Sequence, residues 1–377
     1  MRWSGRRVGQ CRTMYPRASE VCSSPCSISL DTKMSLKDFR TECLDTALDF
    51  LWSQWSAMGV PGSPAWRERR IIDPEALLLF TCTMGRYDAR LFNAMLRWLL
   101  QHERWVNVQR LKNMLKTEGF QAGPVLGAVA ASLQEPTSAS KWRRLAQDRK
   151  AVEEEAEPLF FLRDGKPMPR MQHPDPVFAK RGFLCEPVEL EPDAQLFNPE
   201  EPQNLLLKLR ALFGVNSRCE VVAYLLGREQ AGVSDVTDAT YYFRRTVYNT
   251  LREITLSGLL GLREQAGQHT YGLSLERWMA FLAPGAPAPE WVNWAPLFAA
   301  LERIWSTLDD PDAWEMSRLS LSAELRALMN KVRPKLERVG SISRFVSLDS
   351  ARRGEDYVDL ALQDIRTLLG ILQAPRP

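Results

Sequence analysis

Apolar residues recur every three or four positions over most of the chain from Leu36 onward, and this spacing limits the fold more than any other feature. Leu36, Phe39 and Cys43 begin one such stripe, and comparable stripes continue as far as Leu133. Residues spaced in this way lie on one face of an α-helix. The apolar runs are short and interrupted by charges, so we expect no helix that spans a bilayer and no membrane partner. The sequence therefore predicts a mainly α fold.

Proline-rich stretches divide the helical pattern. Prolines recur between Glu135 and Pro202, where Asp164 and Gly165 separate two extended segments and predict a short hairpin. The stretch "APGAPAPEWVNWAP", residues 283 to 296, cannot continue as one helix. We predict a helical N-terminal domain at 34–134, a proline-rich connector with a short hairpin at 135–202, a third domain at 203–283 and a C-terminal helical bundle at 284–377. Residues 1–33 are either a disordered leader or precede a natural start at Met34.

Residues that usually carry catalysis or metals are scattered. The seven cysteines are an odd number without a secretory signal, which favours reduced thiols and a cytoplasmic location. Cys22 and Cys26 lack the second pair or the nearby histidine that would complete a zinc site. His102, His173 and His269 lie in separate regions, and neither a nucleophile elbow nor a glycine-rich phosphate loop occurs. We therefore expect no enzyme, no catalytic residues, no metal site and no cofactor.

The segment from Ser234 to Leu275 carries the most specific pattern in the chain. A helix capped by Ser234 is followed by a turn at Tyr241 and by a second helix from about Arg244 to Ser257. After Gly258, an apolar stretch, a polar tip and an alternating return predict a β-hairpin. The order of these elements is that of a helix-turn-helix followed by a wing.

This segment resembles the winged helix-turn-helix of bacterial regulators of the ArsR and MarR type. The residues that carry the resemblance are Thr246, Val247, Leu251, Gly258, Leu259, Gly267, Tyr271 and Leu273. The segment departs from the pattern at Tyr241, where such turns often carry glycine, and at Phe243, where a small polar cap is usual. The whole chain also resembles regulators and antitoxins encoded beside nucleotidyltransferase-type toxins. The resemblance implies a sequence-specific transcriptional regulator, autoregulatory in some cases, that binds double-stranded DNA as a homodimer.

The resemblance also implies which side chains contact DNA. The second helix would offer Arg244, Arg245, Tyr248, Asn249 and Arg252, and the wing would add Arg263, Gln265, Gln268 and His269. Arginine can bind guanine or phosphate, and asparagine can read adenine. An earlier helix, "VNVQRLKNMLK", has Gln109, Arg110, Lys112 and Asn113 on its predicted outer face. That face either contacts phosphates or is an ordinary solvated surface.

Two other functions fit the same pattern. In the first, the winged helix is a scaffold, and the chain is a protein-interaction or antitoxin-like protein that neutralises a partner protein. In the second, the chain is a ligand-sensing regulator, with Trp291 and Trp294 lining an aromatic pocket beside the proline-rich stretch.

Overall fold

A computed structural model describes residues 35–63, 66, 68–133, 140–147, 156–169, 173–188, 194–265, 267–339 and 354–373. The predicted leader at 1–33, including Cys22 and Cys26, lies outside the described residues. Residues from Leu36 to Pro377 form one compact unit. Helices account for most of the described chain, which confirms the predicted mainly α fold. In this part of the chain, no helix combines the length and the apolar character needed to cross a membrane.

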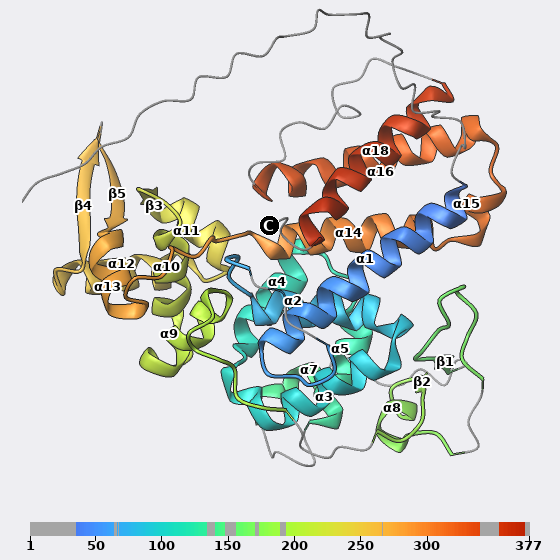
Figure 1. The fold of residues 1–377 in the computed structure, drawn as a ribbon, viewed down its shortest axis with the longest axis horizontal. Helices are drawn as coiled ribbons and strands as arrows, with labels where there is room; N and C mark the ends of the chain where they lie inside the picture. The colour runs from blue at the N-terminus through green and yellow to red at the C-terminus, as the bar shows by residue number, and fades with distance from the viewer. Residues whose placement is uncertain are drawn as a thin grey trace, which may run out of the picture. The chain divides into compact units, whose positions relative to one another are not determined.

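The helical body, defined here as the described residues of 36–188 and 294–372, contains helices from both ends of the chain (Figure 1). Its longer helices are α1 (Leu36–Ala57), α2 (Pro74–Met84), α3 (Ala89–His102), α4 (Val108–Glu118), α5 (Gly123–Ser132), α14 (Trp294–Leu308), α16 (Arg318–Val339) and α18 (Asp356–Leu372). Its short helices are α7 (Arg143–Gln147), α8 (Pro176–Ala179) and α15 (Pro311–Glu315), and single 3-10 turns lie at Gly85–Tyr87, Glu103–Trp105 and Ser140–Trp142. A further 3-10 turn at Pro202–Asn204 leads out of the connector.

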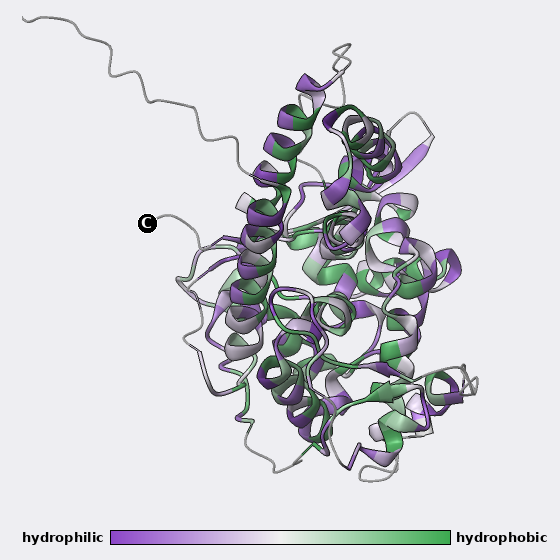
Figure 2. Cartoon of the chain, turned by 90° about the vertical axis from the view of Figure 1, so that its right-hand side faces the viewer, coloured by the Kyte–Doolittle hydropathy of each residue, from purple (hydrophilic) through white to green (hydrophobic). Residues whose placement is uncertain are grey.

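Local sequence signals explain where these helices begin. Asp73 caps α2, and its carboxylate accepts hydrogen bonds from the backbone N–H groups of Glu75 and Ala76, both at 3.2 Å. Pro74 follows at the first helical position, where its missing N–H costs nothing. Helices at the surface, such as α3, turn a hydrophobic side inward and a hydrophilic side outward (Figure 2), whereas α2 is buried on nearly all sides.

One hydrophobic core runs through the whole helical body. It contains buried side chains from α1 to α5 and from α14, α16 and α18. Phe80 of α2, for example, stacks on Phe298 of α14 with ring centroids 4.6 Å apart. The two helical domains predicted at 34–134 and 284–377 therefore share one core.

The connector adds little regular structure. Strands β1 (Glu157–Pro158) and β2 (Phe183–Leu184) pair in parallel over two residues. The predicted hairpin is a single antiparallel bridge between Phe161 and Pro167, turning at Gly165 with φ at 86°. A proline cannot donate to a strand ladder, which explains why the pairing does not extend.

A second, smaller group of elements follows and is called here the α9–α13 module. It comprises α9 (Leu205–Phe213), α10 (Ser217–Leu226), β3 (Ala231–Gly232), α11 (Val233–Thr240), α12 (Arg244–Leu256), β4 (Leu260–Gln265), β5 (Gln268–Leu273) and α13 (Leu275–Leu282). The strands form an antiparallel sheet in the order β3, β5, β4. The predicted cap at Ser234 is wrong: α11 begins at Val233, and the Asp235 carboxylate accepts from the Gly232 N–H at 2.9 Å. Ser234 lies within the first turn.

The body and the module exchange side chains across their boundary. The module has its own core around Val236, Val247 and Leu251. Ile71 of the body packs into that module core, whereas Leu207 and Tyr241 of the module pack into the body core. This exchange fixes the module against the body.

Candidate nucleic-acid interface

Helix α12 has one buried face and one exposed face. Val247, Leu251 and Ile254 are buried against the rest of the module, as their spacing predicts. The helix spans Arg244 to Leu256, within one residue of its predicted bounds. Its exposed side chains include Arg244, Arg245, Tyr248, Asn249 and Arg252. All five predicted contact residues of this helix therefore face solvent.

A groove of about 1090 Å³ lies between α12, the first turn of α11 and the β4–β5 hairpin. Of the nine predicted contact residues, the groove is lined by Arg244, Arg245, Tyr248, Arg252, Gln268 and His269. Leu256, Leu262 and Tyr271 form its apolar part, and Asp235 is the only acidic residue among the described residues that line it. The Asp235 carboxylate is already hydrogen bonded to the Gly232 N–H. The groove is therefore lined by three guanidinium groups together with aromatic and aliphatic side chains.

The arginines of this groove have no acidic partner among the described residues. Within the described part of the chain, no carboxylate forms an ion pair with Arg244, Arg245 or Arg252. By contrast, Arg210 and Arg218 of the same module are paired with Glu220 and Glu253 respectively. Exposed guanidinium groups without an internal partner are free to bind an anion.

The three remaining predicted residues, Asn249, Arg263 and Gln265, do not line the groove. Paired residues of an antiparallel ladder share a face, and neighbouring pairs alternate. Leu262 pairs with Tyr271 beside the groove, whereas Arg263 pairs with Thr270. Arg263 instead lines a different pocket, with Arg228 and Trp291. Asn249 is exposed without lining the groove, and Gln265 ends β4 opposite Gln268.

The turn before α12 is anchored on helix α4 of the body. Arg110 donates to the backbone oxygen of Thr240 at 2.9 Å, and Asn113 donates to that of Tyr241 at 2.8 Å. The Tyr241 hydroxyl donates to the Glu118 carboxylate at 2.6 Å. Three α4 side chains therefore hold two consecutive turn residues.

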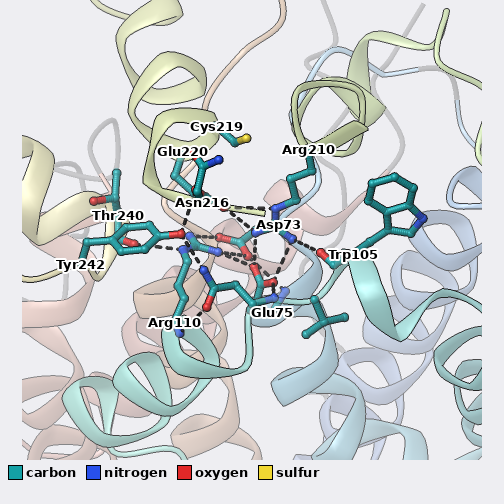
Figure 3. A network of polar contacts seen from close by, with 12 residues as sticks. Asp73, Glu75, Trp105, Arg110, Arg210, Asn216, Cys219, Glu220, Thr240 and Tyr242 are labelled. Atoms are coloured by element: carbon teal, nitrogen blue, oxygen red, sulfur yellow. Dashed lines mark hydrogen bonds and ion pairs between the residues drawn. The ribbon is translucent and has the colours of Figure 1, made fainter. Parts of the chain in front are cut away.

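A buried charge network extends this anchor (Figure 3). Arg110 lies between Asp73 and Glu75, at 2.5 Å and 2.6 Å. Arg210 lies between Glu75 and Glu220, at 2.7 Å and 2.6 Å. All four ion pairs join residues from different elements, so the network connects α2, α4, α9 and α10.

Tyr242 brings the turn into the same network. Its hydroxyl accepts from the Asn107 amide at 2.7 Å and donates to the Glu220 carboxylate at 3.0 Å. Burial and the Glu220 charge raise the pKa of Tyr242, so it remains a donor. Burial would raise the pKa of Asp73, but the charge and hydrogen bonds of Arg110 outweigh it and hold that pKa below its usual value. Asp73 therefore stays ionised beside Arg110.

The expectation for the outer face of α4 is wrong for two of its four residues. Arg110 and Asn113 point inward, toward the network and the turn, while Gln109 is exposed and Lys112 is half-buried. The helical pattern could not reveal this, because an arginine on a polar stripe usually faces solvent. Its partner Asp73 lies 37 positions away in sequence.

Trp291 and Trp294 have separate surroundings, and the described cysteines are buried. Trp294 is buried in the body core, and its indole N–H donates to the Ile71 backbone oxygen at 2.7 Å. Trp291 packs edge-on against Tyr224. The predicted pair therefore does not line one pocket. Cys43, Cys82, Cys185 and Cys219 are free and buried, and burial raises the pKa of each thiol.

Comparisons of the chain with models of known protein families, with curated proteins and with solved structures find no match.

Proposed function

We propose that this protein is a sequence-specific regulator of transcription that binds double-stranded DNA through the groove beside α12. The observation that carries the proposal is the set of exposed arginines, Arg244, Arg245 and Arg252, without an acidic partner among the described residues. Phosphate contacts from such groups position a protein on a duplex, and contacts to base edges give specificity.

The arrangement of the module supports the same function. Helix α11, the turn at Tyr241, helix α12 and the β4–β5 hairpin follow one another in the order of a winged helix-turn-helix. In this arrangement α12 is the recognition helix, and the hairpin, with Gln268 and His269, is the wing. A homodimer would present two such helices to a pseudo-palindromic site. Regulation of its own promoter is part of the proposal.

The test is binding to duplex DNA across a series of salt concentrations. DNA from upstream of the coding sequence and sequences selected from a random pool serve as probes. We expect the Arg244→Ala/Arg245→Ala variant to bind at least about fivefold more weakly, since one bidentate base contact contributes about 1–3 kcal/mol. Removal of a phosphate-binding side chain also reduces the slope of log K against log salt by about 0.9.

The adjacent arginines of α7 provide a matched control. Arg143 and Arg144 are exposed and lie in the body. We expect Arg143→Ala/Arg144→Ala to bind DNA like the wild type. If both double variants bind equally, the recognition surface is not where we place it.

Exposed apolar residues favour a second candidate, an antitoxin-like protein that neutralises a partner protein through the same face. Phe243 is 68% exposed and Leu256 is 78% exposed, and both flank the arginines of α12. Side chains of this kind are commonly buried at protein interfaces. A partner that co-purifies from the native host and that Phe243→Ala releases would support this candidate. If Phe243→Ala releases the partner but leaves DNA binding unchanged, partner binding and DNA binding depend on different residues.

A further inference from the structure

A cavity of about 220 Å³ lies between the start of α3 and the connector, and it is more enclosed than the groove beside α12. Ala89 and Asn93 form one wall, because residues four positions apart share a face of a helix. The apolar side chains of the opposite wall come from the connector and include Pro158, Phe160, Met168, Pro169, Pro174 and Leu184. No described residue lines both this cavity and the groove.

Hydrogen bonds hold the connector segments in place around the cavity. The Met168 N–H donates to the Phe160 backbone oxygen at 3.0 Å, and the Leu159 N–H donates to the Leu184 backbone oxygen at 2.9 Å. Arg86, in the turn before α3, donates to the Leu159 backbone oxygen at 2.9 Å and so ties the connector to the helices. The walls are therefore formed by the fold itself, as in most small-molecule sites.

Asn93 gives this mainly apolar cavity a hydrogen-bonding group. Its side-chain oxygen is buried, and no described residue donates a hydrogen bond to it. The terminal torsion of an asparagine side chain is soft, so a small rotation turns the amide toward an occupant. A lone water is a poor occupant, because a buried water needs about two to four polar partners. The cavity therefore favours an apolar compound that carries one hydrogen-bond donor.

The charges around the cavity disfavour an anion. Glu186 is exposed and is the only charged residue among the described residues that line the cavity. Beside it, burial and the charges of Asp175 and Glu186 raise the pKa of the Cys185 thiol to about 12, so this thiol is neutral at pH 7. An anionic compound would leave water for apolar walls next to a carboxylate, whereas a neutral compound avoids both costs.

The size of the cavity sets the size of the compound. An apolar cavity of about 150 Å³ holds one benzene molecule, so about 220 Å³ holds one ring with a small substituent. Phe160 offers an aromatic side chain against which such a ring packs.

We propose that this cavity binds an uncharged compound with a single aromatic ring and one hydrogen-bond donor, with the ring against Phe160 and the donor on the Asn93 amide. Trp291 and Trp294, which the sequence suggested as the walls of a ligand pocket, do not line it. The inference does not depend on DNA binding, since the cavity shares no described lining residue with the groove beside α12.

The test uses phenol, toluene and benzoate as probes on the full chain, because the three differ little in size but differ in donor and charge. Ligand-observed NMR gives the affinities, and the methyl signal of Met168, assigned with Met168→Leu, shows whether a probe enters the cavity. We expect phenol to shift this signal and to bind about two- to tenfold more tightly than toluene, because only phenol donates a hydrogen bond. Benzoate should bind at least about tenfold more weakly than phenol.

Two variants locate the binding site. Asn93→Leu keeps much of the side-chain volume but removes the amide, so phenol and toluene should bind to it within about twofold of each other. Asn249→Leu, at an exposed position of α12, is the matched control and should keep the wild-type preference for phenol. Ala89→Phe adds a ring at the wall of the cavity and should abolish the Met168 shift with every probe.

The comparison of the three probes on the wild type does not depend on whether any variant folds. If phenol and toluene bind the wild type equally, Asn93 does not recognise the donor and the proposal is wrong. A Met168 signal that none of the probes shifts, or phenol binding that Ala89→Phe leaves unchanged, would show that the cavity is not a binding site. Either result leaves the proposed DNA-binding function untouched.

Discussion

At the scale of single residues, Tyr241 is the most informative position in the chain. It is the only non-glycine residue with positive φ in the described structure, at 61°. This left-handed conformation costs most residues about 1–2 kcal/mol, which is why such turns often carry glycine. Here the ring is buried in the body core and the hydroxyl binds Glu118. The sequence indicated that this position departs from the usual turn, but Glu118 lies 123 positions away and no local pattern points to it.

Removal of the Tyr241 hydroxyl tests this role. A hydrogen bond to a charged group contributes about 1.5–3 kcal/mol, so we expect Tyr241→Phe to lower the free energy of unfolding by about that amount at pH 7. Lys335 and Arg338 still hold the Glu118 carboxylate in this variant. The ring also remains, so the core is not opened. Urea unfolding of the two proteins measures the difference.

The effect of Tyr241→Phe should depend on pH in a defined direction. Burial would raise the pKa of Glu118, but hydrogen bonds from Arg338 and Tyr241 and the charge of Lys335 outweigh it and hold that pKa below its ordinary value of 4.5. A carboxyl with a lowered pKa in the folded state stabilises the fold above its unfolded pKa, and this stabilisation disappears as the pH falls through the folded pKa. The difference between the two proteins should therefore be full at pH 7 and shrink below about pH 4.5. A difference that stays constant across this range would contradict the assignment.

At the scale of elements, the sequence predicted α12 and the hairpin but not which way each of their residues faces. Apolar spacing determines a helix and its buried side within one element, which explains the agreement for Val247 and Leu251. The direction of Arg263 depends on the register of β4 against β5 and on which side of the sheet packs against α12. The direction of Arg110 depends on carboxylates in another helix. Both are tertiary properties that periodicity does not contain.

The different surroundings of Arg252 on α12 and Arg263 on β4 lead to a prediction. Arg252 lines the groove, whereas Arg263 lies in the pocket with Trp291. We expect Arg252→Ala to weaken DNA binding and to reduce the salt slope by about 0.9. Arg263→Ala should stay within about twofold of the wild type, or about 0.4 kcal/mol, because its side chain lies away from the proposed DNA site. Titration of one duplex with both variants checks this, and a larger effect of Arg263→Ala would reverse the orientation proposed for the hairpin on DNA.

At the scale of the whole molecule, contacts between residues far apart in sequence decide which helices share a core. The helices before Leu133 and after Trp294 share one core, although the sequence between them suggested separate domains. Proline-rich stretches show where helices end, but they do not show whether the next helix returns to an earlier core. The module keeps a core of its own and is joined to the body by exchanged side chains and by the buried network.

Arg210 is the residue on which this joint most depends, since its guanidinium is fully buried and binds both Glu75 of the body and Glu220 of the module. Arg210→Met fills much of the same volume but leaves Glu220 without its cation, which costs about 3–5 kcal/mol. We expect the amides of α10 and α12 to exchange hydrogen faster in this variant, while those of α14 and α18 keep their wild-type protection, because the body core does not need the pair.

The exposed pair of Arg218 and Glu253 provides the control for Arg210→Met, because Arg218→Ala should change stability by less than about 1 kcal/mol. Equal loss of protection in α12 and α14 would mean that the body and the module unfold as one unit. Arg210 would then stabilise the whole molecule rather than the joint. Faster exchange confined to the module would instead show that the buried charges hold α12 in place, so that a variant with an intact groove could still lose DNA binding.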